Sequence, residues 1–475
     1  MDIALNLPEI IQRIGWFLPL WEPTEEQGDS FVLYPQDLVA CARVCHTWRR
    51  TLLPLLGRVY DGEEMERWNT AWPNYLFPYC RLARLNTTTL LDHPHLTQLT
   101  ELEVCTTASH AQAIQILHSN VHLQRLSWSI PDTRDMNTVS HTDVITALES
   151  LSSLRSLTLD SFHWCFDRFA HVINRNAELT SLTMSHCRGL EDIEKNLFMN
   201  NVKELYLDCA WRVNAGLLDL IWESANLELL MVRLDQDCPL VELCEILQER
   251  CPKVTALKCT RLGREEEEEA QSGSIVRDQI AMLVESVKCL NSLELNVYEL
   301  SDDICSGFLD IRANDLERVE IVVHRDSKES LASASRILTS CPGLRSFSIT
   351  RQCSDPFWYD STWSYGVVSA LFEKVWVCAG LESLIIGDIE DPSRLPEYTE
   401  ASALAVTIGD YGWRVKQGRP LGQHGYCLTL ALAKKAIEQA VHMPRLKAFK
   451  VNRFTFVRQG VSHLIRAPPS QSQIM

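Results

Sequence analysis

The sequence lacks several features that define whole classes of protein. It has no run of about 18 or more apolar residues, which argues against a transmembrane helix. Asp2, Pro8, Glu9 and Arg13 interrupt the apolar residues at the N-terminus, so we expect no secretory signal. Positive charge is not in excess: the formal net charge is −17, which argues against binding driven by nucleic-acid phosphates. We therefore expect neither a membrane nor a nucleic acid as a partner.

Motifs for catalysis and for metal or nucleotide binding are missing as well. Cys41, Cys45 and His46 do not have the Cys-x-x-Cys-His spacing that attaches haem. His93 and His95 have no third metal ligand nearby in the sequence. The glycines of residues 418–425 lack the Gly-Lys-Ser/Thr ending of a phosphate-binding loop, and no Gly-x-Ser-x-Gly elbow occurs. The sequence therefore predicts a protein that is not an enzyme and holds no metal or cofactor.

The composition is that of an ordinary globular protein. The 475 residues are 46% hydrophobic and 23% charged, enough for two or more domains or for one elongated array. The 17 cysteines are scattered through a chain that is too long to be a disulfide scaffold, which favours a reduced cytoplasmic or nuclear setting. We expect Cys187, Cys209 and Cys259 to be small core or ladder residues rather than nucleophiles.

Two apolar patterns with helical spacing occupy the first fifty residues. The first pattern consists of Leu7, Ile10, Ile11, Ile14, Phe17 and Leu18, and Pro8 suits its first turn. Pro35 and Asp37 precede a second stripe, which consists of Leu38, Cys41, Cys45, Trp48 and Leu52. Because so short a segment cannot bury a large core alone, we expect residues 1–52 to form a helical module that packs against a neighbour.

A short register returns from about residue 99 onward: an apolar residue, two others, an apolar residue, one other and an apolar residue. Its copies begin at Leu99, Leu123, Leu154, Leu179, Val202, Leu227, Val254, Leu290, Leu316, Leu344, Leu381 and Leu446. Successive starts lie 23 to 37 residues apart, apart from a last interval of 65 residues, which implies an insertion. Such intervals are typical of leucine-rich repeats, whose period is roughly 20–29 residues.

Each repeat supplies a short strand whose alternate side chains point inward, and only stacked neighbours cover its apolar face. Helical patterns lie between the strands, at residues 111–117, 217–222, 240–247, 280–287 and 331–338. The predicted fold is therefore α/β: an N-terminal helical module followed by a curved leucine-rich-repeat solenoid over residues 99–466. We expect parallel strands inside this solenoid and helices outside.

The intervening residues 53–98 are aromatic rather than rich in glycine and serine. A flexible linker would have the opposite composition. We interpret this segment as a packed cap on the first repeat, with a degenerate strand at residues 82–85.

Insertions are expected near residues 263–275, 353–366 and 388–427. The first contains the charge run 265–269, which is interpreted as an exposed loop or as a dock for a basic partner. The third contains a glycine-rich segment that would suit a lid, and we expect residues 467–475 to be a disordered tail.

The second insertion is aromatic. It contains Trp358 and Trp363, which form either a small satellite core or the anchors of a binding loop.

The N-terminal pattern resembles the F-box, and the repeats resemble those of F-box leucine-rich-repeat proteins. The F-box likeness rests on Leu-Pro-Glu-Ile-Ile at residues 7–11 and on Val-Cys-His-Thr-Trp-Arg at residues 44–49. Cys251-Pro and Cys341-Pro end helical patterns as in cysteine-containing repeats, although the favoured Asn or Cys eight residues after a start is clear only at Cys187.

The resemblance implies an adaptor. In this family the F-box binds the Skp subunit of an SCF ubiquitin ligase, Skp links to cullin and RING subunits, and the repeats hold a protein substrate for ubiquitination. The chemistry belongs to these partners, so the chain would be a non-catalytic subunit. Carried over by motif, the adaptor-binding residues are Leu7, Pro8, Ile10, Ile11, Ile14, Leu38, Val44, Cys45 and Trp48.

Two positions depart from the family pattern. Residues 19–36 form an insertion where the family has a short link, and this insertion either leaves the adaptor-binding face open or obstructs it. Gly57 stands where many relatives carry Trp, and we expect it to loosen the cap. The alternative function is therefore a protein-binding scaffold whose diverged F-box no longer engages the ligase.

The residues between the leucines of each strand are the candidates for substrate binding. In the fifth and sixth repeats these are Glu204, Tyr206, Asp208, Leu229, Met231 and Arg233, to which we add Trp358 and Trp363. Aromatic, Met and Arg side chains are enriched in interface cores, so Tyr206, Met231 and Arg233 are the candidate anchors; the alternative is that they are ordinary exposed residues. The sequence does not identify the substrate.

Overall fold

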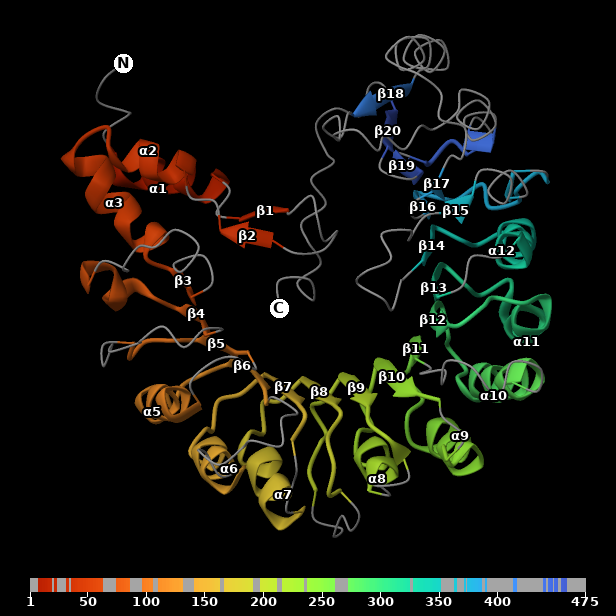
Figure 1. Cartoon of the computed structure of the whole chain (residues 1–475), viewed down its shortest axis with the longest axis horizontal. Coiled ribbons are helices and arrows are strands. Elements are labelled where there is room, and N and C mark those ends of the chain that lie inside the picture. Colours follow the sequence, from red (N-terminus) through yellow and green to blue (C-terminus); the bar gives the residue numbers. More distant parts are fainter. Residues whose placement is uncertain are drawn as a thin grey trace. The chain divides into compact units, whose positions relative to one another are not determined.

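The computed structural model of the chain (Figure 1) has two compact units, one within residues 1–224 and one within residues 225–467. It describes residues 7–18, 21–23, 31–33, 36–62, 74–85, 96–105, 110–130, 141–162, 166–190, 197–211, 216–234, 237–260, 272–324, 328–351, 363–364, 371–372, 374–386, 389–390, 413–416, 439–440, 443–446, 448–451 and 454–458. No helix among these residues is long and apolar enough to cross a membrane.

The first unit begins with three helices and a hairpin. The helices are α1 (Pro8–Phe17), α2 (Gln36–Ala42) and α3 (His46–Leu56). The second apolar stripe of the sequence therefore spans two helices, because the chain turns at Val44 and is extended at Cys45, the residue before α3. Within the predicted insertion, β1 (Trp21–Pro23) and β2 (Phe31–Leu33) pair antiparallel.

In the described part of the first unit, seven parallel strands follow. They are β3 (Val59–Asp61), β4 (Leu82–Leu85), β5 (Glu101–Val104), β6 (Arg125–Ser129), β7 (Ser156–Asp160), β8 (Ser181–Ser185) and β9 (Glu204–Asp208). The register aligns Leu102, Leu126, Leu157, Leu182 and Leu205, all buried, because a row of inward side chains must stay in line to form one core. The strands already begin at Val59, within the segment that the sequence assigned to a cap.

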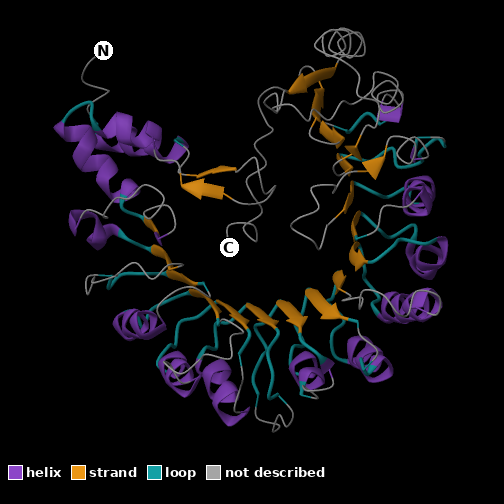
Figure 2. Ribbon diagram, in the orientation of Figure 1, coloured by secondary structure: helices purple, strands orange, loops and turns teal. Residues whose placement is uncertain are grey.

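Helices cover one side of this sheet (Figure 2). They are α5 (His110–Ser119), α6 (His141–Glu149), α7 (Phe166–Arg175) and α8 (Leu217–Trp222), and the short 3-10 helix η2 (Asn74–Tyr79) precedes β4. The patterns at 111–117 and 217–222 are confirmed as helices, whereas α6 and α7 were not predicted.

The second unit repeats this arrangement. Its parallel strands are β10 (Leu229–Arg233), β11 (Ala256–Thr260), β12 (Ser292–Val297), β13 (Arg318–Val323), β14 (Ser346–Arg351), β16 (Ser383–Ile386) and β19 (Ala448–Val451). Its helices are α9 (Leu240–Glu249), α10 (Ser272–Ser286), α11 (Asp302–Arg312) and α12 (Lys328–Ser340). Every repeat start from Leu99 to Leu446 lies two residues before a strand, which confirms the α/β repeat fold.

Further strands of the second unit pair differently. β18 (Trp413–Lys416) and β20 (Phe454–Arg458) join the sheet antiparallel beyond β19, and β15 (Trp363–Ser364) pairs with β17 (Ile389–Glu390). The charge run 265–269, Trp358, the glycine-rich segment 409–426 apart from β18, and the tail 467–475 lie outside the described residues.

A turn of constant geometry precedes many of the strands. The first residue of the register donates its backbone N–H to the carbonyl oxygen three residues earlier, as in Leu179 to Asn176 (2.9 Å) and Leu344 to Cys341 (3.3 Å). Cys251 holds the same position before Val254 (3.3 Å). The two Cys-Pro pairs noted in the sequence therefore mark a structural position that asparagine fills in other repeats.

The asparagines at this position tie neighbouring repeats together. Asn176 is buried, and its side-chain nitrogen donates to the carbonyls of Val172 (2.8 Å) and Leu151 (3.2 Å) while its oxygen accepts from the N–H of Leu154 (2.8 Å). Asn120 makes the corresponding contacts in an earlier repeat. The side chain thus pairs backbone groups that two successive turns leave open.

An ion pair on the helix side joins α6 to α7. Arg168 donates from Nε and Nη2 to the two carboxylate oxygens of Glu149 (2.7 Å each), and Nη2 also donates to the Thr146 hydroxyl (2.7 Å). The hydrogen bonds from Arg168 lower the pKa of Glu149.

We therefore predict that this pair loses its stabilising effect in acid. A carboxyl with a depressed pKa in the folded state stabilises the fold above its unfolded pKa of about 4.3, and the effect disappears as the pH falls through the lower folded pKa. Glu149→Gln should cost about 1 kcal/mol of unfolding free energy at pH 7 and much less near pH 3.5. Thermal unfolding at both pH values measures this, and an equal deficit at both would contradict it.

Candidate functional site: the N-terminal helices and the sheet face

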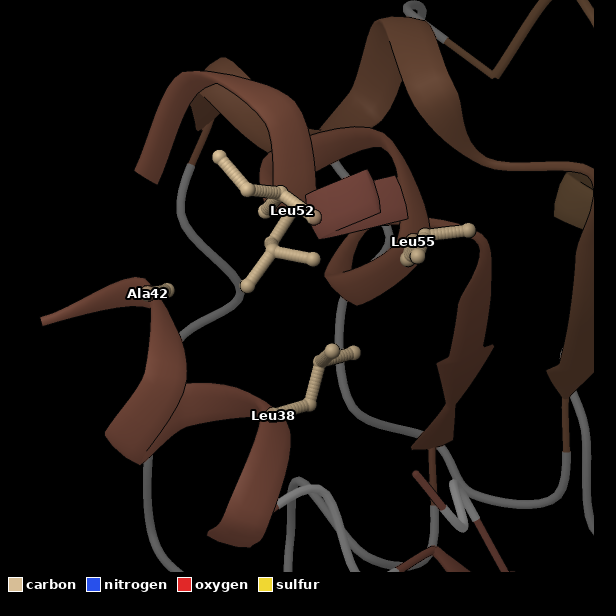
Figure 3. Packing of buried hydrophobic residues seen from close by; sticks show 5 residues of the cluster. Leu38, Ala42, Leu52 and Leu55 are labelled. Carbon is tan, nitrogen blue, oxygen red and sulfur yellow. The ribbon is translucent and has the colours of Figure 1, made fainter. Parts of the chain in front are cut away.

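One apolar core holds the three N-terminal helices together. It consists of Ile11 from α1, Leu38 and Ala42 from α2, and Leu52 and Leu55 from α3, with Leu18, Cys41, Trp48 and Leu56 packed against it. Figure 3 shows the side chains of Leu38, Leu52 and Leu55 in the space between their helices. Gly15 brings α1 close to α3, because a Cβ there would lie 2.6 Å from the methyl groups of both Leu52 and Leu55.

Helix α1 has a second apolar stripe that faces away from this core. Leu7 is 45% exposed, Ile10 is 38% exposed, Ile14 is half-buried and Phe17 is 79% exposed. These residues recur three and four positions apart, so they lie on one side of the helix. Exposed apolar side chains that gather on one helix face are typical of a docking surface, whereas single ones are ordinary.

The turn between α2 and α3 also exposes predicted adaptor-binding residues. Val44 is 65% exposed and Cys45 is exposed, while Trp48 in the first turn of α3 is half-buried. The carbonyl of Cys45 accepts the N–H of Arg49 (2.9 Å), which fixes this turn to the start of α3.

The structure separates the predicted adaptor-binding residues by their burial. Leu7, Pro8, Ile10, Val44 and Cys45 are exposed, and Ile14 and Trp48 are partly so. Ile11 and Leu38 are fully buried in the core, so they pack the module and present no surface to a partner. Phe17 was part of the predicted stripe but was not assigned to the site, and it is exposed on the same face of α1 as Leu7 and Ile10.

Trp16 was not predicted as a site residue, and the structure gives it a contact of its own. It is 58% exposed, and the guanidinium of Arg58 lies 5.3 Å from its ring centroid. This cation–π contact links α1 to the residues that lead into β3.

Gly57 joins the helical module tightly to the repeats, contrary to the expectation that it loosens the cap. A Cβ at this position would lie 2.9 Å from the carbonyl oxygen of Leu76 and 3.0 Å from Cβ of Tyr79. Both residues belong to η2, which precedes β4. A side chain at position 57 has no room because α3 and η2 approach closely there.

We predict that Gly57→Ala destabilises the first unit by about 1–3 kcal/mol, since the new methyl group meets a backbone atom that cannot rotate away. Thermal unfolding measures this effect. Gly380→Ala is the matched control, because a Cβ there meets its nearest atom at an ordinary 3.8 Å. Equal melting temperatures for the two variants would show that the contact at Gly57 is unimportant.

The predicted substrate-binding residues of β9 and β10 project from the sheet face opposite the core. Glu204, Tyr206 and Asp208 alternate with buried residues in β9, which belongs to the first unit. In the second unit, Leu229, Met231 and Arg233 alternate with buried residues in β10. All six are half-buried. Trp363 lies in β15, and its side chain, like all of Trp358, falls outside the described residues.

The buried cysteines have the chemistry of packing residues. Burial raises the pKa of the Cys259 thiol to about 12. The sulfur of Cys187 lies 3.6 Å from the carbonyl oxygen of Leu159. The sulfur of Cys209 lies 3.3 Å from the carbonyl oxygen of Met184. A thiol with a raised pKa, such as that of Cys259, is a poor nucleophile. The described residues hold no group of three or more His, Cys, Asp or Glu side chains placed to bind a metal ion.

Aligned buried leucines, parallel strands and alternating helices together decide the fold class. The chain has an α/β leucine-rich-repeat fold. No protein-family model matches its sequence, and no curated protein sequence does.

Among solved structures, the chain is similar to the leucine-rich repeat-containing protein LegL7 from Legionella pneumophila, with 15% identity and a TM-score of 0.35, over 62% of this chain and 91% of that one. It is also similar to TLR13 in a crystal structure with ssRNA13, with 11% identity and a TM-score of 0.31. That match covers 66% of this chain and only 50% of the TLR13 chain.

Proposed function

We propose that this protein is the substrate-recognition adaptor of an SCF ubiquitin ligase, docking on the Skp subunit through its N-terminal helices. The observation that carries the proposal is the second apolar stripe of α1, formed by Leu7, Ile10, Ile14 and Phe17, which is not used by the module's own core. Covering this stripe with a partner would remove apolar surface from water, at about 25 cal/mol per Å².

The attachment of the helices to the repeats supports the same function. Helix α3 ends at Leu56, β3 begins at Val59, and β3 pairs with β4, so the docking end continues directly into the repeat sheet. A substrate bound to the repeats would thus be held at a defined place near the ligase. Such proximity raises the effective concentration of a substrate lysine without any catalytic group in this chain.

In this proposal the sheet face opposite the helices binds the protein substrate, and Skp, cullin and RING subunits supply the chemistry in the cytoplasm or the nucleus. The alternative is a protein-binding scaffold that does not engage the ligase. The hairpin of β1 and β2 is the feature that favours this alternative, because it occupies the place of a short link between the first two F-box helices.

Affinity capture separates the two functions. The tagged full-length protein is mixed with purified Skp adaptor, and we expect a complex of one copy of each. Recovery of a stable partner from cells without Skp or cullin would support the scaffold instead. Capture with residues 1–52 deleted should still retain the substrate, which would accumulate because it is no longer ubiquitinated.

A further inference from the structure

The charged side chains on the sheet face of the first unit are paired with each other on its first strands but not on its last. Three outward rows cross strands β7 to β9, and the middle one consists of Thr158, Thr183 and Tyr206 in register. The row at the strand ends consists of Asp160, Ser185 and Asp208. Figure 2 shows that the helices of this unit lie on the other side of these strands.

Opposite charges are paired on the earlier strands of this face. Arg84 in β4 contacts Asp61 of β3 (3.6 Å) and Glu103 of β5 (2.9 Å). Arg125 of β6 likewise pairs with Glu101 of β5. These strands therefore present little uncompensated charge to a ligand.

The later strands carry carboxylates that no lysine or arginine of the described residues pairs with: Asp160 of β7, and Glu204 and Asp208 of β9. Asp160 contacts the His186 ring (3.0 Å), whose side chain is 57% exposed. One carboxylate oxygen of Asp208 is buried and has no hydrogen-bond partner in the described part of the chain. An unpaired buried oxygen costs free energy, and because Asp208 as a whole is only partly buried, its carboxylate group remains within reach of a cationic side chain.

The turns that follow β7 and β8 are stabilised by backbone hydrogen bonds and not by these carboxylates. Ser161 (φ 62°) and His186 (φ 53°) follow β7 and β8 in the left-handed region. Their N–H groups donate to the carbonyls of Ser185 and Asp208, at 2.9 Å each. The turns are thus held by the backbone, which leaves the carboxylates available for binding.

The separation of two of these carboxylates indicates the conformation of the bound ligand. One strand, β8, separates β7 from β9, and the register places Asp160 and Asp208 in the same row. Neighbouring strands are separated by about 4.8 Å, so the two carboxylates lie roughly 9–10 Å apart across the strands. A polyproline II segment rises about 3.1 Å per residue and repeats every three residues, so side chains three apart lie on one side at about 9.3 Å. A β-strand would place such side chains on opposite sides.

We infer that the β7–β9 face binds an extended, basic segment of a partner protein in which two Lys or Arg side chains stand three residues apart in a polyproline II conformation. One cation meets Asp160 and the other meets Asp208. Ser185 lies between the two aspartates in the same row, and Thr158 and Thr183 lie in the neighbouring row. This inference deepens the proposed function, on which it rests, by naming the chemistry of the substrate.

The test uses the full-length protein and a short fluorescent proline-rich peptide with two arginines three residues apart. Fluorescence anisotropy should show that the wild type binds this peptide at least tenfold more tightly than the same peptide with two glutamates. Asp160→Asn together with Asp208→Asn should weaken binding roughly tenfold, because each partly exposed ion pair contributes a factor of up to about five. Raising the salt concentration should weaken wild-type binding in the same direction.

Asp143→Asn is the matched control, since Asp143 is an exposed aspartate of α6 on the helix side of the same unit. It should bind the arginine peptide as the wild type does. Equal binding of the arginine and glutamate peptides, or equal losses in the control and in the double variant, would overturn the inference. Skp capture by the same proteins is measured separately. Loss of peptide binding while Skp binding is retained would refute this inference but not the proposed function.

Discussion

Replacing Ile10 by aspartate is expected to weaken the binding of the Skp adaptor by at least a hundredfold while leaving the fold intact. Ile10 is 38% exposed and contributes nothing to the core of Ile11, Leu38, Leu52 and Leu55. In the free protein the new carboxylate stays in water, so the free energy of unfolding changes little. In the complex it would be buried in an apolar interface without a partner, which costs several kcal/mol.

Titration calorimetry measures the affinity, and circular dichroism verifies the helices. Ile311→Asp is the matched control, because Ile311 is also a helical isoleucine with 38% exposure, but lies in α11 of the second unit. We expect this control to bind Skp with wild-type affinity. If both variants bind Skp equally well, the stripe of α1 is not the docking face.

The second large effect concerns the repeats. Asn176→Leu keeps the approximate volume of the side chain but leaves three buried backbone groups without partners: the carbonyls of Leu151 and Val172 and the N–H of Leu154. Each unpaired group costs about 1–3 kcal/mol, and partial relaxation makes about 3 kcal/mol the expected total. In a unit of about 200 residues this lowers Tm by roughly 6–12 °C.

Asn201→Leu is the comparison for this variant. Asn201 also donates to a carbonyl of the preceding repeat, that of Ala177 (2.8 Å), but it does so at the exposed surface. Water replaces a lost partner there, so we expect a change within about 0.5 kcal/mol. Similar melting temperatures for the two variants would mean that the buried asparagine does not hold the repeats together.

The repeat array could be predicted because burial imposes its period on the sequence. Leu157, Leu182 and Leu205 must each face the core at the same place in a strand, and the spacing of leucines records this requirement directly. The degenerate strand at residues 82–85 was found by the same rule and is confirmed as β4. β3 was missed because Val59–Asp61 is short and lacks the register, and its pairing with β4 creates the strand.

Spacing alone could not divide the apolar residues of α1 between core and surface. Ile10 and Ile11 are neighbours in the sequence and lie about 100° apart around a helix of 3.6 residues per turn, so one wide stripe contains both. The position of α3, brought close by Gly15, decides that Ile11 is buried and that Ile10 remains exposed. This is tertiary information that a single helical pattern does not contain.

The sequence does contain a signal for the role of asparagine. Cys251, Cys341 and Asn176 all lie three residues before a repeat start, so they occupy equivalent positions in their repeats. The contacts of Gly57 had no such signal, because its neighbours in η2 come from a later part of the chain.

Hydrogen–deuterium exchange of the full-length protein with and without the Skp adaptor tests the central claim most directly. Docking through the second stripe of α1 predicts slower exchange in residues 8–17 and 44–50 when Skp is present, with the strands of the repeat sheet unchanged. Exchange that stays the same in these helices at saturating Skp, or protection that is confined to the sheet face, would contradict it.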